Sequence, residues 1–203
     1  MDTINRRSLL KLLSTAPVAA SLVWTEAEAQ QAHDHAEAAR TTAAQTRTAF
    51  TPKFFTAHEY ATVTVLVDLI IPKDERSGSA TEAGVPEFMD FMMIDNPGRQ
   101  TAMRGGLAWI DRECLKRWDK PFVDCAAAER TGLLDDISWP QRAKPETLHG
   151  VTFFTSFRDL TASGFWTTKM GFADLQYIGN TFVPEWKGCP DEVLKKLGLT
   201  ANG

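Results

Sequence analysis

Three cysteines are the residues of this 203-residue chain best suited to forming covalent bonds. Cys114 and Cys125 lie on either side of the helix-breaking run Asp119-Lys120-Pro121. If the flanking helices form an antiparallel hairpin, the two thiols stand at similar height, and an internal disulfide is geometrically possible. Cys189 is then left over, and an unpaired thiol in an oxidising compartment suggests an intermolecular bond. The alternative is three buried free thiols.

The histidines could act as metal ligands or proton carriers. His33 and His35 stand close together, but two imidazoles alone make a poor metal site, so a solvated segment is favoured. His58 falls in the first turn of a predicted helix, where we expect a solvated side chain. His149 either contacts a partner or is buried and hydrogen-bonded, and we favour the structural role.

The remaining polar residues do not complete a catalytic set. Two acidic pairs, Asp90 with Asp95 and Asp135 with Asp136, are expected on solvated helix faces. The chain has no G-x-S-x-G, H-E-x-x-H or C-x-x-C-H motif, and no glycine stands in a G-x-G pattern. The sequence therefore predicts no catalytic, cofactor-binding or metal-binding residues in this chain.

Aromatic residues are concentrated late in the chain, where residues 150–186 hold nine of the 20. Five of these nine stand among glycines and a proline rather than at helical spacing: Trp166, Phe172, Tyr177, Phe182 and Trp186. Such side chains either fold back onto their own domain or are buried in a partner. Aromatic anchors are typical of interface hot spots, so these five are the candidate partner interface.

The overall composition indicates a globular protein, with 43% hydrophobic and 24% charged residues. The net charge of −4, from 22 basic and 26 acidic residues, argues against a nucleic-acid-binding protein. No apolar run reaches the roughly 20 residues that a membrane-spanning helix needs. We therefore expect no direct membrane span.

The N-terminal segment has the pattern of an export signal. Arg6-Arg7 precede a modestly apolar stretch over 12–24, and Ala27-Glu28-Ala29 is a small-x-small cleavage site. A twin-arginine signal over 1–29 is the favoured interpretation, and an ordinary secretory signal or a retained amphipathic anchor are the alternatives. Residues 30–52, rich in Ala, Thr, Gln and His, are predicted to form a flexible tether. A helical domain over 53–203 follows.

The periodicity predicts a mainly α fold, a compact bundle of about five or six helices with long irregular loops. No strand alternation and no internal repeat are present. The tail from Met170 to Cys189 is expected to be mostly loop, and loops of this length suggest ordering by a partner. Six helices are predicted. The first begins with a Thr56/Glu59 capping box and ends at Pro72, the second begins at Val85-Pro86, and the third spans Arg99 to Trp118. The fourth runs from an Asp124 cap to Ile137, the fifth from near Glu146 to Gly164, and the last from Asp191 to Leu197, before Gly198.

Two blocks of sequence resemble the gluconate 2-dehydrogenase subunit 3 family. The first runs from Asp68 to Asp90 and contains D-L-I-I-P-K-D and T-E-A-G-V-P-E-F-M-D. The second, from Phe154 to Asn180, reads F-x-x-x-R-x-L-T-x-x-G-F-x-T and continues through L-x-Y-x-G-N. Where the family often has Ser-Pro-Gly-Ala, residues 77–80 read S-G-S-A. The resemblance covers roughly 54–190, together with the twin-arginine signal.

The resemblance implies a non-catalytic small subunit of a periplasmic, FAD-dependent sugar or sugar-acid dehydrogenase. In such complexes a large subunit holds FAD and oxidises the substrate, and a multihaem cytochrome c subunit with haem c takes the electrons. The small subunit resembles a chaperone that escorts the large one through the twin-arginine export machinery, and it meets the inner membrane only through the complex. A disulfide from Cys189 to the large subunit is our hypothesis.

Two alternatives belong to other classes of protein. A free-standing exported helical binding domain would be a stable monomer with its aromatic residues buried internally. A self-sufficient oxidoreductase would carry its own cofactor, and the missing cofactor fingerprints count against it. The substrate of the complex, the disulfide pairing and the cleavage of the signal are not decided by the sequence.

Overall fold

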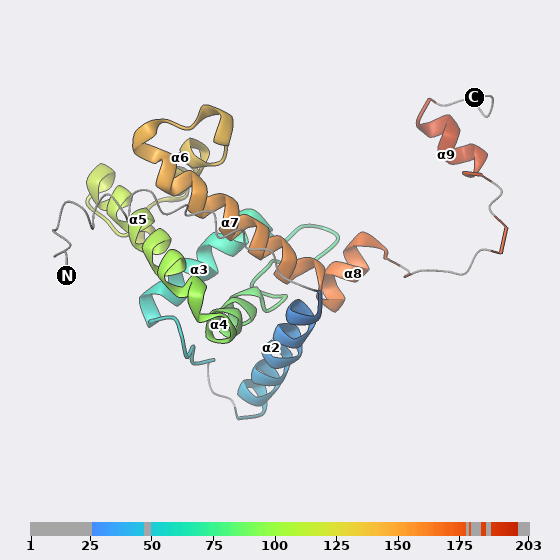
Figure 1. Cartoon of the computed structure of the whole chain (residues 1–203), viewed down its shortest axis with the longest axis horizontal. Helices are drawn as coiled ribbons and strands as arrows, with labels where there is room; N and C mark the ends of the chain where they lie inside the picture. Colours follow the sequence, from blue (N-terminus) through green and yellow to red (C-terminus); the bar gives the residue numbers. More distant parts are fainter. Residues whose placement is uncertain (1–25, 47–49, 178, 180–183, 186–187, 199–203) are drawn as a thin grey trace, which may run out of the picture.

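Helices make up nearly all of the regular structure in the computed structural model, which describes residues 26–46, 50–177, 179, 184–185 and 188–198 (Figure 1). No strand occurs among these residues, so the predicted mainly α fold is confirmed. The helices are α2 (Glu26–Thr46), α3 (Ala57–Ile70), α4 (Val85–Asp95), α5 (Gln100–Trp118), α6 (Ala127–Ile137), α7 (Leu148–Trp166), α8 (Lys169–Leu175) and α9 (Asp191–Lys196).

Helix α7 is the central element of the bundle. It packs against α3, α4, α5, α6 and α8, and α2 reaches it as well. Its apolar face carries Phe157, Leu160 and Phe165, none of which is exposed to solvent. These side chains meet the fully buried Phe88 of α4 and Ile110 of α5 in one continuous core. Figure 1 shows α9 apart from this bundle.

The start of α3 confirms the predicted capping box. The Thr56 side chain accepts a hydrogen bond from the Glu59 backbone N–H at 3.2 Å, and the Glu59 carboxylate accepts one from the Thr56 N–H at 2.8 Å. Arg104 of α5 donates to the same carboxylate at 2.7 Å and to the Phe54 carbonyl at 2.6 Å. Its guanidinium also lies 4.4 Å from the centre of the Phe54 ring. The entry to α3 is thereby joined to α5.

Asp90 corrects one expectation, because it is not on a solvated face. Its carboxylate is 2% exposed and accepts three backbone hydrogen bonds, from Lys53 at 2.9 Å, Phe54 at 2.9 Å and Phe55 at 3.0 Å. The three donors precede α3, where no helical partner is available to them. Asp90 therefore anchors the segment that leads into α3 onto α4, whereas Asp95 is exposed as expected.

The flexible tether predicted over 30–52 is wrong for most of its length, because α2 extends from Glu26 to Thr46. Ala29, Ala32 and Ala36 are buried along one side of α2, which packs on α4. The His33 ring stacks on Phe88 with ring centres 4.7 Å apart, and His35 stacks on Phe91 at 4.3 Å. Alanines give a weak apolar signal in sequence, yet their small size lets two helices approach closely.

The export-signal prediction falls largely outside the described residues, which include neither Arg6 nor Arg7. The proposed cleavage site Ala27-Glu28-Ala29 lies in the first turn of α2. The boundaries 1–29, 30–52 and 53–203 therefore stay predictions.

Two further local expectations are corrected. Asp124 does not cap α6, because it lies in a short 3-10 turn over Phe122–Asp124 and the helix begins at Ala127. Glu129 instead accepts a hydrogen bond from the Ala126 N–H at 2.7 Å. The tail after residue 169 is not all loop either, since α8 occupies its first part.

Candidate partner-binding site

The two sequence blocks quoted above lie against each other in space. Arg76, in the loop before α4, forms an ion pair with Asp174 of α8, with 3.2 Å between Nη2 and Oδ1. A Cβ at Gly78 would lie 3.0 Å from Met170 Cε, and one at Gly164 would lie 2.9 Å from the Phe88 ring. The glycines thus allow close contact between the 73–84 loop, α4, and the α7–α8 corner.

The 73–84 loop makes several hydrogen bonds within this chain. The Asp74 carboxylate accepts hydrogen bonds from the Arg76 and Ser77 N–H groups at 2.8 Å each. The backbone hydrogen bonds to Ser77 and Arg76 lower the pKa of Asp74. Asp68 accepts from the Thr81 N–H at 2.8 Å, and Arg40 of α2 donates to the Glu82 carbonyl at 2.7 Å.

Helix α8 presents an apolar surface to solvent. Phe172 is 41% exposed, Leu175 56% and Tyr177 58%. The rings of Phe172 and Tyr177 stack with their centres 5.6 Å apart. We call these three residues the α8 apolar face. The exposure of Phe172 and Tyr177 is what burial of these aromatic residues in a partner would require.

The position of α8 is set by its tight junction with α7. Thr168 caps α8 by accepting a hydrogen bond from the Gly171 N–H at 3.0 Å. A Cβ at Gly171 would overlap the Phe165 carbonyl, so only glycine allows this approach. Trp166 is half-buried, and its ring packs edge-on against the Phe165 ring with 4.9 Å between the ring centres. Of the predicted interface, Trp166 therefore packs on the core, whereas Phe182 and Trp186 lie outside the described residues.

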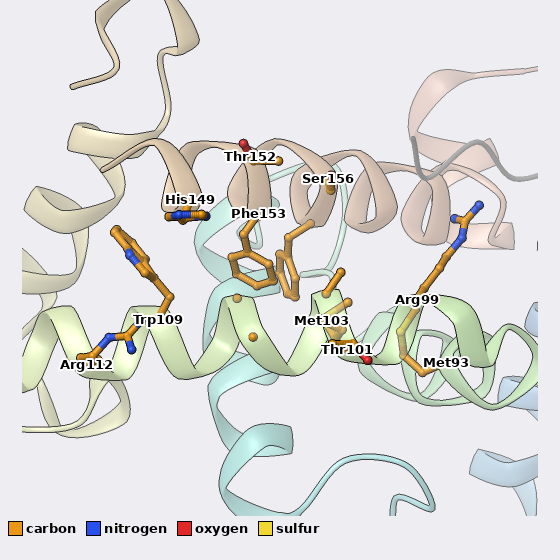
Figure 2. Close-up of a pocket in the computed structure, with 14 residues that line it drawn as sticks. Met93, Arg99, Thr101, Met103, Trp109, Arg112, His149, Thr152, Phe153 and Ser156 are labelled. Carbon is orange, nitrogen blue, oxygen red and sulfur yellow. The ribbon is translucent and has the colours of Figure 1, made fainter. Parts of the chain in front are cut away.

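A groove of about 450 Å³ lies between α5 and α7 (Figure 2). Phe153 of α7 points down onto Gly106 of α5, and Trp109 of α5 rises beside Gly150 of α7. A Cβ at either glycine would overlap the opposing ring. Sequence reasoning did not predict this groove. The signal was the pairing of a glycine with an aromatic residue in each of two helices.

His58 is not simply solvated. Its Nε2 lies 2.6 Å from Asp111 Oδ2, and Asp111 Oδ1 accepts a hydrogen bond from the Phe122 N–H at 2.9 Å. The pair links α3 to α5 and to the turn after α5.

His33 and His149 occupy contrasting environments. The His33 ring is hydrogen-bonded to the Thr167 hydroxyl, and burial lowers the pKa of His33 although a backbone hydrogen bond and nearby acids oppose this. His149 is exposed at the rim of the α5–α7 groove rather than buried, which fits the partner-contact alternative.

Cys114 and Cys125 are both buried and lie together as free thiols, so the predicted proximity across the 119–121 break is correct. Burial, with a smaller contribution from the hydrogen bond to Cys125, raises the pKa of Cys114 to about 12. A thiol of this kind is unreactive in the folded state. The internal disulfide stays a prediction. Cys189 is exposed and free, as an intermolecular bond would require.

Neither a cluster of metal ligands nor a helix that could span a membrane occurs in the described part of the chain. There, no three side chains of His, Cys, Asp or Glu come together in a way that could hold a metal ion. None of the helices described combines the length and apolar character needed to cross a membrane.

The family assignment agrees with this geometry. A sequence model of the family described as gluconate 2-dehydrogenase subunit 3 matches residues 57–184, more than half of the chain. The chain belongs to the gluconate 2-dehydrogenase subunit 3 family. The matched region runs from α3 to α8, so this subunit 3 chain holds both the α8 apolar face and the α5–α7 groove within the family domain. Comparisons with curated proteins and with solved structures gave no match.

Proposed function

We propose that this chain is the non-catalytic small subunit of a periplasmic FAD-dependent sugar or sugar-acid dehydrogenase, and that it acts as chaperone and twin-arginine export escort for the large subunit. The family match over residues 57–184 carries the proposal, because the family is a subunit of a gluconate 2-dehydrogenase complex. The Arg6-Arg7 pair supports the escort role. FAD belongs to the large subunit, and haem c to a cytochrome subunit that receives the electrons.

The α8 apolar face is the surface we assign to the large subunit. Phe172 and Leu175 lie exposed on α8, and Tyr177, just after the helix, is exposed and stacks on Phe172. Burying apolar surface gives about 25 cal/mol per Å², so such side chains are strong anchors once a partner covers them. Cys189 follows this face in the chain and is exposed, so we place an intermolecular disulfide to the large subunit there.

The escort role is tested by purifying the chain, tagged at its C-terminus, from the periplasm of its native host. We expect a large flavin-containing subunit to co-purify, recognisable by its absorbance. Changing both Arg6 and Arg7 to Lys should remove both proteins from the periplasm. A lone, colourless monomer would refute the proposal and favour the free-standing binding domain, and flavin bound to the isolated chain would favour a self-sufficient oxidoreductase.

The assigned surface is tested with a matched pair of leucines. Leu175 on the α8 apolar face is 56% exposed, and Leu115 on α5 is 49% exposed. Leu175→Ala should weaken binding of the large subunit about tenfold or more, as truncation of an interface anchor does, whereas Leu115→Ala should have little effect. Equal affinities for the two variants would exclude this face as the interface.

The proposed disulfide is tested on non-reducing gels of the purified complex. A band containing both subunits should be present for the unchanged chain and absent for Cys189→Ser. An identical band pattern for the two proteins would refute the disulfide without affecting the escort role.

A further inference from the structure

We infer that the α5–α7 groove is a second docking surface, which receives an apolar side chain of the large subunit flanked by carboxylates. The inference rests on the proposed function and adds the chemistry of the partner segment. The groove is separate from the α8 apolar face, because none of Phe172, Leu175 and Tyr177 lines it. Two separate contact surfaces would let a small subunit hold a much larger partner in one orientation.

The floor of the groove is built to hold an apolar group. Phe153 of α7 faces α5, which contributes Met103 and Trp109, and Met93 of α4 lies at one end (Figure 2). Phe157 of α7 also lines the groove. The volume of about 450 Å³ lies within the range of binding pockets in general and accommodates one or two large side chains. Gly105 adds no side chain to the groove, and the space beside it is open, because a Cβ placed there meets no atom within 4 Å.

The lining of the groove carries positive charge from two arginines. Arg112 stands at one end and Arg99 at the other (Figure 2), and none of the lining residues is acidic, although Glu28 of α2 lies near enough to Arg99 to interact with its charge. This electrostatic complementarity favours an acidic segment of the partner.

Hydroxyl groups complete the site. Thr101 of α5 and Thr152 and Ser156 of α7 line the groove, where their hydroxyl oxygens can accept hydrogen bonds from a polypeptide backbone; the Thr152 hydroxyl proton is already donated to the Leu148 carbonyl at 3.0 Å. An apolar floor between polar, cationic rims is the arrangement expected for a polypeptide whose anchor side chain is flanked by Asp or Glu. Because the proposed function pairs this chain with the large subunit, we assign the occupant to that subunit.

The test fills the groove without disturbing the fold. Gly105 lines the groove, and a Cβ placed there meets no atom within 4 Å, so Gly105→Leu introduces a side chain into open space. Gly132 in α6 has the same open surroundings but lies outside the groove, so Gly132→Leu is the matched control. Both changes favour the helix, and circular dichroism of each variant verifies folding.

Affinity is then measured between each variant of the full chain and the purified flavin-containing large subunit. We expect Gly105→Leu to weaken binding about tenfold or more, and Gly132→Leu to bind like the unchanged chain. Equal binding by all three proteins would overturn the groove assignment and leave the proposed function intact. Failure of the unchanged chain to bind any large flavoprotein would overturn both.

A charge reversal tests the acidic part of the inference. Arg112→Glu at the groove should weaken binding severalfold and remove much of its salt dependence. Arg158→Glu is the control, because Arg158 is exposed on α7 outside the groove and forms an ion pair with the adjacent Asp159. If both reversals change the affinity for the large subunit equally, the positive charge at the groove does not contribute to binding of the partner.

The occupant itself is identified by crosslinking. A photo-reactive benzoylphenylalanine in place of the exposed Thr101 should crosslink, within the assembled complex, to a peptide of the large subunit that contains apolar and acidic residues. A crosslink to a second copy of this chain, or to a basic peptide, would overturn the inference.

Discussion

Replacing Asp90 should be among the most damaging single changes in this protein. Its carboxylate, 2% exposed, accepts backbone hydrogen bonds from Lys53, Phe54 and Phe55 at 2.9, 2.9 and 3.0 Å. Two of the three donors are fully buried and the third is partly buried. Removing the carboxylate leaves these N–H groups without a partner where water cannot replace it.

The magnitude follows from these contacts. A hydrogen bond to a charged group contributes about 1.5–3 kcal/mol, and a buried donor left unpaired costs about 1–3 kcal/mol. With two buried donors and one that water can partly reach, Asp90→Ala should lower the free energy of unfolding by about 3–5 kcal/mol. Asp90→Asn keeps one acceptor oxygen but turns an amide N–H₂ toward the remaining donor, so about half of that loss is expected.

The assay is thermal and guanidinium unfolding of the full chain, followed by circular dichroism. For a chain of this size a loss of 4 kcal/mol corresponds to a fall in Tm of roughly 8–16 °C. Asp95→Ala on the same helix is the control, because Asp95 is exposed, and it should change stability by no more than about 0.5 kcal/mol. If Asp90→Ala and Asp95→Ala unfold at the same temperature, the anchoring role of Asp90 is refuted.

Three further predictions concern neighbouring glycines, a buried histidine and the thiols. Gly106→Ala, whose Cβ would overlap an aromatic ring of α7, should lower the free energy of unfolding by about 1–3 kcal/mol, as measured by thermal unfolding. Gly105→Ala should raise the free energy of unfolding by about 0.5–1 kcal/mol. Equal effects of the two changes would contradict the close α5–α7 contact. Because burial lowers the pKa of His33, its contribution to stability is complete above the ordinary pKa of 6.5 and is lost as the pH falls through the lower folded-state pKa. Hydrogen exchange of the α2 amides should therefore accelerate in acid, and less so in His33→Gln. Identical protection of α2 on both sides of this pH range would refute the prediction. Cys189 alone should react quickly with a thiol reagent in the native protein, and all three thiols should react after unfolding. If only one thiol reacts after unfolding without reductant, the internal disulfide is present instead.

Local signals predicted most of the helices in the bundle. The Thr56/Glu59 capping box placed the start of α3, and Pro86 placed the first turn of α4, because each acts on backbone groups within a few residues. Helix α2 was missed because its buried positions are alanines, which look polar-neutral in a segment rich in Gln, His and Thr. Asp124 has a side chain suited to an N-cap, but it lies in a 3-10 turn before α6, and the Glu129 carboxylate accepts the hydrogen bond from the Ala126 N–H at the start of that helix.

The candidate site divides in the same way. The concentration of aromatic residues after position 150 pointed to a partner surface, and Phe172 and Tyr177 are indeed exposed. That Trp166 packs on the core instead could not be predicted, because it depends on how α7 and α8 meet at Gly171. The α5–α7 groove required the separation of the two helices, which no local pattern encodes.

The sequence by itself determined the helical class, most helix boundaries, the family and the candidate export signal, because these depend on residue type, short-range spacing or direct similarity between sequences. Only the tertiary structure decided that Asp90 is buried under the chain entering α3, and that Gly106 faces Phe153. These contacts join residues more than 30 positions apart in the sequence. Whether a carboxylate is exposed to solvent, or whether a ring packs against a glycine, depends on which distant residues the fold places beside it.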